Sequence, residues 1–418
     1  MPHNLRERIA SYWLPMPRSS AAAWLPRWRL ICSLSTLADK FFMATTTTQL
    51  QQLILARIQQ AGRMTFAEYM RMALYEPGYG YYVNGESHVG WQGDFYTSTD
   101  VADFFAHCMG RQLQSMWEKL GRPEPFTVLE QGAGRGDLAH GVQNWARQEA
   151  PELARALTYH TADIKSGQDA LQAERLQALA PTVIISNELV DAFPVHIVEK
   201  HGAQLYELYV VEQEGRLGVL LDEPSSPEVA NYLDSYKIPW RSFEDGWRAE
   251  INLDALTWMA RTAQLLTTPV ACPTRRGKRH GYILAIDYGE KARELYSRYR
   301  HYGTLACYYQ HQLVEQPLAR PGRQDITAHV NFSALINEGR RHGLHLSGYT
   351  TQREWLKAYG IDEELTRIRA RDFAIIDTER SSDRGQAALL QWYNLRQRAA
   401  ALTDPAGMGN FKVLILRH

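Results

Sequence analysis

The chain has 418 residues, of which 45% are hydrophobic and 11% aromatic, a composition that excludes general disorder and leaves room for about two to three domains. Lysine plus arginine and aspartate plus glutamate number 46 each, so no net charge attracts the whole chain to nucleic acid or to an acidic membrane. The four cysteines form no close pair, which argues against a disulfide framework or a zinc site and suits a reducing compartment. No apolar run approaches the roughly 18 residues that span a bilayer, and we predict a soluble protein that binds neither nucleic acid nor metal.

The first 43 residues differ in composition from the rest of the chain. Five arginines and several serines accompany only two acidic residues, Glu7 and Asp39. An arginine-rich, acid-poor start of this kind is the composition of a mitochondrial transit peptide. The alternative, which we favour, is an upstream extension with Met43 as the true start. On either interpretation we expect residues 1–43 to be disordered and to lie outside the fold.

Residues 44–125 are expected to form a mainly helical region that lines the substrate. Apolar residues at helical spacing begin at Leu50. Thr65 and Glu68 then fit a capping box that begins a second helix, and Pro77-Gly78 ends it. Two loops that follow are rich in glycine and aromatic residues: Pro-Gly-Tyr-Gly-Tyr-Tyr at 77–82 and Gly-Asp-Phe-Tyr-Thr-Ser at 93–98. Loops of this composition line a ligand or cover an apolar surface.

From residue 126 onward, strands alternate with helices. Residues 138–148 predict a helix between the first two of four short apolar strands. The four predicted strands lie at residues 127–130, 156–163, 182–186 and 282–287. Short buried strands that alternate with helices are typical of a mostly parallel sheet with helices on both faces. We therefore predict a Rossmann-like α/β core over residues 126–418.

Residues 196–221 follow a different pattern inside this core. Apolar and polar residues alternate there as in antiparallel strands, and Gly202 and Gly215 stand at the expected turns. We predict an inserted β arm over about residues 196–248.

A glycine-rich turn, Glu130-Gln-Gly132-Ala-Gly134-Arg-Gly136-Asp137, joins the first strand of the core to its helix. Glycines at such a turn let a ligand approach backbone N–H groups and the helix N-terminus. The dinucleotide pattern G-x-G-x-x-G would place its third glycine at position 137, which is an aspartate. The observed E-x-G-x-G-x-G spacing resembles motif I of class I methyltransferases, whose ligand has no pyrophosphate. The alternative is a glycine turn that serves only close packing of helix and sheet.

Polar residues follow two further strands. Asp163 ends the second strand, where an acid can accept hydrogen bonds from both ribose hydroxyls of a nucleoside; alternatively it forms a turn or caps a helix. Asn187 and Glu188 follow the third strand, and ligands of open α/β sheets bind at the carboxyl ends of strands. The alternative there is an Asx turn, with Glu188 capping a short helix.

Further motifs come in a fixed order along the chain. The strongest is Asn187-Glu188-x-x-Asp191-x-x-Pro194-Val195-His196. Shorter ones are Asp287-Tyr288-Gly289, Gly303-Thr-Leu-x-Cys-Tyr-Tyr309, Asp325-Ile-Thr-Ala-His-Val330 and Gly348-Tyr-Thr-Thr-Gln352. Together with the 77–82 and 93–98 loops and the glycine turn, they resemble the MidA family from about residue 50 to the end. This family includes the mitochondrial arginine methyltransferase that assists assembly of respiratory complex I. Two departures are Asn331, where the family usually carries aspartate, and a longer loop at residues 268–280.

The resemblance implies an S-adenosyl-L-methionine-dependent methyltransferase that methylates an arginine side chain of a protein, with a respiratory complex I subunit as the implied partner. The implied cofactor residues are Glu130, Gly132, Gly134, Gly136, Asp137, Asp163, Asn187 and Glu188. The implied catalytic residues, which face the substrate, are Asp94, Glu188, Asp191 and His329. Acids suit this role because a guanidinium stays charged and an acid pair can hold it bidentately. His329 would accept the proton that leaves after transfer; a lone histidine in a polar loop is otherwise structural.

Two other functions remain as alternatives. Asn331 motivates a non-catalytic assembly factor that binds S-adenosyl-L-methionine. A nicotinamide-dependent oxidoreductase is disfavoured because Asp137 breaks the glycine spacing. The oligomeric state stays open, with a homodimer among the options. We expect a cytoplasmic protein of bacterial type, or a mitochondrial matrix protein if residues 1–42 are a transit peptide.

Overall fold

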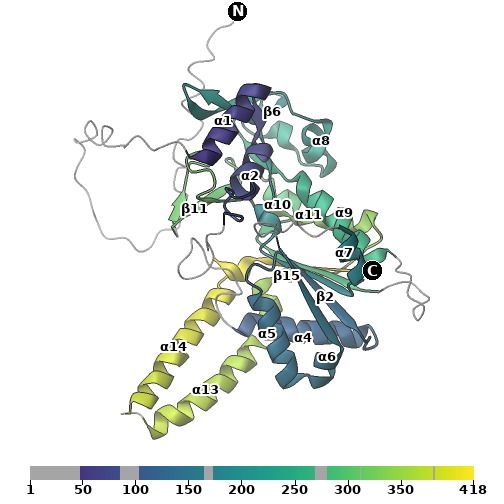
Figure 1. Cartoon of the computed structure of the whole chain (residues 1–418), viewed down its shortest axis with the longest axis vertical. Helices are drawn as coiled ribbons and strands as arrows, with labels where there is room; N and C mark the ends of the chain where they lie inside the picture. The colour runs from purple at the N-terminus through teal and green to yellow at the C-terminus, as the bar shows by residue number, and fades with distance from the viewer. Residues whose placement is uncertain (1–47, 85–102, 164–172, 269–279, 311, 380–381) are drawn as a thin grey trace, which may run out of the picture.

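The computed structural model describes residues 48–84, 103–163, 173–268, 280–310, 312–379 and 382–418. It confirms the predicted α/β class, with a central sheet covered by helices on both faces and a second, smaller sheet beside it (Figure 1). The predicted leader at residues 1–43, the loop that carries Asp94 and most of the 268–280 loop lie outside the described residues. Within the described ranges, no helix has the length and apolar character that a membrane crossing requires.

The central sheet has six strands in the order β15-β16-β9-β4-β2-β3. β2, β3, β4 and β9 run parallel to one another, and β16 runs antiparallel to both of its neighbours. The bounds are β2 Phe126–Gln131, β3 Leu157–Ala162, β4 Val183–Asn187, β9 Tyr282–Asp287, β15 His345–Thr351 and β16 Lys412–Arg417. The chain passes from β2 to β3 on one side and then to β4 on the other, so the strand order reverses at β2. The carboxyl ends of β2 and β4 therefore flank a topological switch point, where ligands of open α/β sheets bind.

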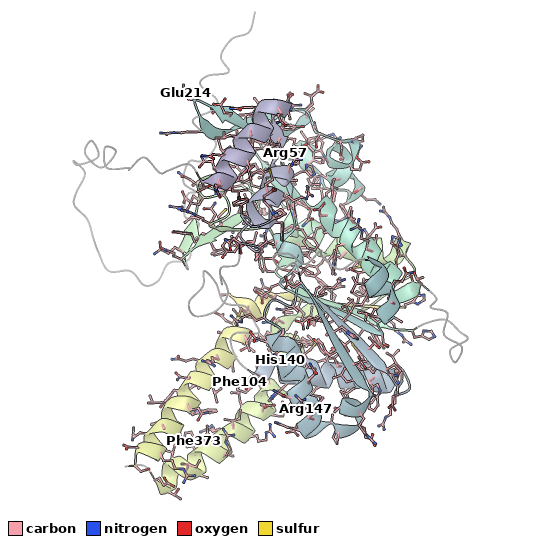
Figure 2. The ribbon with its side chains drawn as sticks, in the orientation of Figure 1. Arg57, Phe104, His140, Arg147, Glu214 and Phe373 are labelled. Atoms are coloured by element: carbon pink, nitrogen blue, oxygen red, sulfur yellow. The ribbon has the colours of Figure 1, made fainter. Side chains whose placement is uncertain are left out.

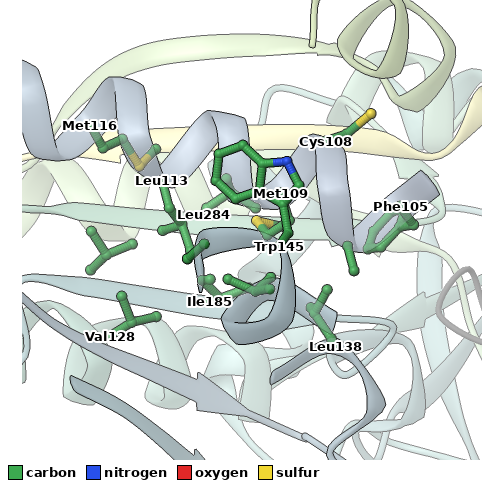
Figure 3. Packing of buried hydrophobic residues seen from close by; sticks show 14 of the residues in the cluster. Phe105, Cys108, Met109, Leu113, Met116, Val128, Leu138, Trp145, Ile185 and Leu284 are labelled. Atoms are coloured by element: carbon green, nitrogen blue, oxygen red, sulfur yellow. The ribbon is translucent and has the colours of Figure 1, made fainter. Parts of the chain in front are cut away.

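Apolar side chains alternate between the two faces of this sheet. Val128, Ile185 and Leu284 pack beneath the helices of one face, together with Met109 and Trp145 (Figure 3). The neighbouring residues Leu129, Ile184 and Ile283 belong to the core on the opposite face. The first face carries α4 Asp103–Lys119, α5 Asp137–Glu149, α6 Pro151–Ala156 and α12 Gln352–Ala358. The second carries α7 Ala173–Leu179, α9 Leu253–Thr267 and α11 Phe332–Arg341. Burial on both faces explains why the strands read as continuous apolar runs.

The inserted β arm forms antiparallel strands as predicted, and β1 from the N-terminal region pairs with β6 to complete a sheet of five strands. Its strands are β1 Met64–Thr65, β5 His196–His201, β6 Gln204–Gln213, β7 Arg216–Asp222 and β8 Arg248–Ile251. Gly202 and Gly215 occupy the two hairpin turns with positive φ, as their positions in the sequence predict. α8 (Pro227–Ser235) lies between β7 and β8 in the chain. Three other short elements follow later: β10 Gly289–Glu290, α10 Ala292–Leu295 and β14 Val330–Asn331.

The N-terminal helices pack on the arm. α1 (Gln49–Ala61) and α2 (Phe66–Tyr75) share a hydrophobic cluster with β5, β6 and a small sheet of β11 (Ala306–Tyr309), β12 (Gln312–Val314) and β13 (Asp325–Thr327). The predicted capping box of Thr65 and Glu68 begins α2. α4 packs instead on α5 against the central sheet. The predicted division at residue 125 thus groups helices that contact different sheets, and it stays a prediction.

A long helical hairpin extends from the core near the C-terminus (Figure 1). It consists of α13 (Ile361–Thr378) and α14 (Asp383–Thr403), and Phe373 packs on Trp392 between them (Figure 2). Its base is fixed by Glu364, which contacts His107 at 2.7 Å and also pairs with Arg111. Burial opposes ionisation of Glu364, but the hydrogen bonds from His107 and Arg111 outweigh it and lower its pKa to about 2. The hairpin is thereby held to α4 by ionic contacts.

The contact of α4 with α5 gives a test of the core packing. A Cβ at Gly110 would lie 2.1 Å from Cε3 of Trp145. Alanine normally stabilises a helix relative to glycine, but here we expect Gly110→Ala to lower the free energy of unfolding by about 1–3 kcal/mol through overpacking. Denaturant unfolding measures it, with the exposed Glu118→Ala in α4 as the matched control. A stabilised Gly110→Ala variant would contradict this packing.

Candidate functional site

The glycine turn after β2 leaves open space beside its backbone. Gly132, Gly134 and Gly136 all have positive φ, from 53° to 80°. A Cβ at Gly132 would lie 2.8 Å from Cδ1 of Leu189, whereas a Cβ at Gly134 would meet no atom within 4 Å. Gly132 is therefore required for packing against the chain that follows β4. The space beside Gly134 is available to a ligand, as expected of a turn that exposes backbone N–H groups.

Asp163 lies against this turn. The backbone N–H of Gly134 donates a hydrogen bond to Oδ2 of Asp163. The N–H groups of Gly132 and Ala133 donate to the carbonyl of Ala162, at 2.8 and 3.3 Å. The structure therefore brings the acid at the end of β3 beside the glycine turn, as a shared ligand site requires.

The two acids that flank the turn differ in environment. Glu130 is 3% exposed and accepts a hydrogen bond of 3.0 Å from Tyr159. Burial raises its pKa to about 7, against the lowering effect of that hydrogen bond. Asp137, in the first turn of α5, is exposed and pairs with Arg135 at 2.7 Å. Glu130 is therefore the acid of this pair whose charge changes near neutral pH.

Asn187 and Glu188 stand together at the end of β4. Asn187 is 9% exposed, and its Oδ1 is buried with no hydrogen-bond partner among the described residues. Its Nδ2 donates to Oε1 of Glu188 at 3.1 Å. Glu188 has a φ of 50°, a strained backbone that is uncommon outside glycine and clusters at functional sites. The N–H of Glu188 donates to the carbonyl of Ile286 at 2.9 Å, which holds the turn against β9.

Asp191 has one carboxylate oxygen without a hydrogen-bond partner among the described residues. It lies in a short 3-10 turn, Val190–Ala192, and is 5% exposed. Tyr288 donates a hydrogen bond to its Oδ2, while its Oδ1 is buried without a hydrogen-bond partner. Burial raises the pKa of Asp191 to about 6, and the bond from Tyr288 opposes this shift. Asp191 is therefore ionised at neutral pH but close to its titration range.

Asp287 fixes the position of this turn. It ends β9, and its Oδ2 accepts the N–H groups of Val190 at 2.9 Å and Asp191 at 3.3 Å. Burial, followed by the charges of Asp191 and Glu188, raises its pKa well above the usual value. Three carboxyl groups thus gather at the carboxyl ends of β4 and β9. This arrangement favours a cation, because a positive charge would relieve their repulsion.

His329 adjoins the same cluster. Its ring centroid lies 5.4 Å from that of Tyr288, and its backbone N–H donates to Oγ1 of Thr304 at 3.1 Å. Its Nδ1 is buried and has no hydrogen-bond partner in the described part of the chain. Burial, with added repulsion from Arg300 and Lys412, lowers its pKa to about 4. The ring is consequently neutral at physiological pH.

Asn331 has a structural role in this fold. Its Oδ1 accepts the N–H of Ala334 at 3.2 Å and so caps α11, and its Nδ2 donates to the hydroxyl of Tyr232 at 3.2 Å. Asparagine caps a helix as well as aspartate does. The departure from the family pattern at this position therefore preserves a helix cap.

The structure brings together most of the residues singled out in the sequence. Around the switch point lie the glycine turn, Asp163, Asn187, Glu188, Asp191 and His329. Asp94 falls outside the described residues. No role was predicted from the sequence for Asp287 or Tyr288. The sequence does carry a signal for Asp287, because it is an acid at the end of a strand, as Asp163 is.

Comparison with known proteins agrees with this geometry. Residues 108–350 match the model of a family described as "Putative S-adenosyl-L-methionine-dependent methyltransferase". The chain belongs to this family. It is thus an S-adenosyl-L-methionine-dependent methyltransferase with the expected Rossmann-like fold.

Individual relatives cover most of the chain. "Protein arginine methyltransferase NDUFAF7 homolog, mitochondrial" of Drosophila melanogaster is 26% identical over 406 residues, which is 86% of this chain and 83% of the relative. The rat protein named "Protein arginine methyltransferase NDUFAF7, mitochondrial" is 28% identical over 342 residues, 75% of this chain and 74% of its own. A crystal structure of a "likely methyl transferase" from Burkholderia thailandensis, bound to S-adenosyl-homocysteine, superposes with a TM-score of 0.71 at 27% identity, covering 88% of this chain and 92% of the other.

The open space at Gly134 gives a test of the cofactor site. We expect Gly134→Val to stay folded but to lower the affinity for S-adenosylhomocysteine at least about 100-fold, because the branched side chain fills the space beside the backbone. Calorimetry measures the affinity. Gly343→Val is the matched control, since Gly343 also has positive φ and open surroundings but lies in the turn after α11. Equal affinities in the two folded variants would contradict this site.

The raised pKa of Glu130, about 7, predicts a pH dependence of cofactor binding. An acid with a raised pKa is protonated below that pH, so a contact that needs its carboxylate weakens as the pH falls. We expect the affinity for S-adenosylhomocysteine to be about tenfold lower at pH 6 than at pH 8, as titration of one group near pH 7 gives. Glu130→Gln should remove this slope. The same slope in both proteins would show that Glu130 does not cause it.

Proposed function

We propose that this methyltransferase modifies arginine side chains of a protein. Two kinds of observation support the proposal. The relatives from Drosophila melanogaster and rat are named protein arginine methyltransferases and align with most of the chain. The site carries a buried carboxylate, Asp191, with one oxygen that has no hydrogen-bond partner among the residues that the structure describes. The second observation carries the proposal, because a buried and incompletely paired carboxylate is costly unless a cationic ligand completes its contacts.

The residues around the switch point fit S-adenosyl-L-methionine. Gly134 offers backbone beside open space, and Asp163 next to it suits ribose hydroxyls. The unpartnered Oδ1 of Asn187 suits a donor such as an ammonium group. Glu130, Gly132, Gly136, Asp137 and Glu188 complete the proposed set, of which Gly132 and Gly136 act through the shape of the turn. When bound, the cofactor supplies the methyl group.

Asp191 is the proposed contact for the guanidinium. Tyr288 donates to its Oδ2 and Asp287 holds its backbone, so Oδ1 is fixed and has no hydrogen-bond partner among the described residues. A guanidinium has several N–H donors in a plane, and a charge-assisted hydrogen bond to Oδ1 would orient the reacting nitrogen. Glu188 lies near Asp287, whose pKa its charge helps to raise, and we propose that it assists the same contact. Asp94 remains a proposed partner outside the described residues.

The environment of the site favours Asp191 over His329 as proton acceptor. Methyl transfer to a guanidinium releases one proton, and an efficient acceptor has a pKa near the working pH. The pKa of Asp191 is about 6, whereas that of His329 is about 4. We therefore propose that Asp191 both holds the guanidinium and takes the proton. In this proposal His329 supports the position of Tyr288 through its ring contact.

The substrate protein and the compartment are also proposals. A subunit of respiratory complex I is the proposed substrate, on the basis of the family resemblance. The relatives named above are mitochondrial. The cytoplasm of a bacterial-type cell is our first proposal for this chain, and the mitochondrial matrix is the alternative if residues 1–42 act as a transit peptide.

Amino-acid analysis of the product tests the function. The chain is incubated with methyl-labelled S-adenosylmethionine and an extract from cells that lack it, and the protein fraction is hydrolysed. We expect label in methylated arginine. Asp191→Asn should reduce transfer about 100-fold, the scale of a few kcal/mol in the barrier, with cofactor affinity within about threefold.

Asp383→Asn serves as the control for this experiment, because Asp383 is an exposed acid in the first turn of α14. It should transfer at the wild-type rate. Label in methyl-lysine would overturn the proposed substrate. Near-normal transfer by Asp191→Asn would overturn the role of Asp191.

A further inference from the structure

The aromatic loop after α2 folds back over the helix end. The N–H groups of Tyr81 and Tyr82 donate to the carbonyls of Ala73 and Leu74, each at 3.0 Å. Gly80 makes this return possible, since a Cβ there would lie 2.6 Å from backbone atoms of the last helical turn. The ring of Tyr82 is thereby stacked on Tyr75, with centroids 5.6 Å apart and an interplanar angle of 23°.

Both hydroxyls of this stacked pair tie it to the site. Tyr75 donates to the carbonyl of Ala192 at 2.9 Å, within the turn that carries Asp191. Tyr82 donates to Oδ1 of Asp325 in β13 at 2.8 Å. The pair therefore bridges the N-terminal helices and the acidic cluster, and neither ring can shift without breaking one of these bonds.

Tyr75 lies near acids of both proposed binding sites. Burial raises the pKa of Tyr75 well above its usual value, and the next contributions come from Asp191, Asp325 and Asp163. Asp191 is the proposed guanidinium contact, and Asp163 is the proposed ribose contact. The side chain of Tyr75 is half-buried, in contrast to Tyr69 and Tyr81, which are fully buried in the cluster below. An aromatic ring near carboxylates suits a flat cation, which can contact the ring and the acids together.

We propose that Tyr75, with Tyr82 stacked behind it, forms an aromatic wall against which the substrate guanidinium lies while Asp191 binds its edge. This inference rests on the proposed arginine specificity and adds the feature that distinguishes arginine from lysine. A planar guanidinium stacks on an aromatic face, whereas an ammonium is a compact and strongly hydrated charge. Tyr75 and Tyr82 are thus specificity-determining residues, and the 77–82 motif places Tyr82 against Tyr75.

Binding of small probes to the full chain saturated with S-adenosylhomocysteine tests the wall. The probes are N-acetyl-arginine methylamide and N-acetyl-lysine methylamide, titrated by NMR. We expect the wild type to bind the arginine probe at least about fivefold more tightly than the lysine probe, and Tyr75→Leu to lose about five- to tenfold for arginine alone. Tyr75→Phe keeps the ring and should remain within about twofold. Tyr79→Leu is the matched control, because Tyr79 is an exposed tyrosine of the same loop.

The outcomes separate this inference from the proposed function. The proposed aromatic wall is overturned if Tyr75→Leu binds the arginine probe as tightly as the wild type does while its affinity for S-adenosylhomocysteine is intact. A wild type without preference for arginine overturns it as well. In both cases the labelled amino acid found in the product still decides arginine methylation by itself. If Tyr75→Leu no longer binds S-adenosylhomocysteine, Tyr82→Leu carries the same comparison.

Discussion

The rest of the site depends on the buried carboxyl group of Asp191, because the surrounding residues must compensate for its burial. It is buried beyond the carboxyl end of β4, where an unpaired charge is costly, and within the described part of the chain only one of its oxygens has a hydrogen-bond partner. Asp287 fixes its backbone through two N–H groups, and Tyr288 occupies its other oxygen. The free oxygen is thus held in place before any ligand arrives. Preorganisation of this kind lets a substrate cation be oriented without rearranging the protein.

Two parts of the chain must come together to build this environment. The parallel sheet supplies the glycine turn, Asp163 and the turn after β4. The helices at the N-terminus pack on the inserted arm, and their end places Tyr75 beside Ala192. The arm therefore contributes to the site, because it supports α2, the helix whose last residue is Tyr75. For the same reason, Tyr75 and Tyr82 lie far in sequence from Ala192 and Asp325, the residues that they contact.

Much of this arrangement follows from local sequence. The four parallel strands of the central sheet, the capping box of α2 and the hairpin glycines have local signals, and the structure contains them at the predicted positions. The antiparallel pair β15 and β16 was not predicted. The proximity of Asp163 to the glycine turn follows from parallel pairing of adjacent strands. The contacts of Tyr75 and Tyr82 could not be predicted, because each joins residues more than 100 positions apart through tertiary packing. The pKa shifts of Glu130, Asp191 and His329 depend on burial, which a single sequence does not specify. The α13–α14 hairpin was not predicted either, since its exposed helices carry a weak apolar pattern.

We propose that cofactor and substrate meet between Asp163 and Asp191, with Tyr75 beside them. A crystal structure of the complex with S-adenosylhomocysteine tests this arrangement. We expect the ribose hydroxyls to contact Asp163 and the sulfur to face the side of Asp191 and Tyr75. A complex in which the sulfur points away from Asp191, or in which the nucleoside occupies another part of the sheet edge, would contradict it.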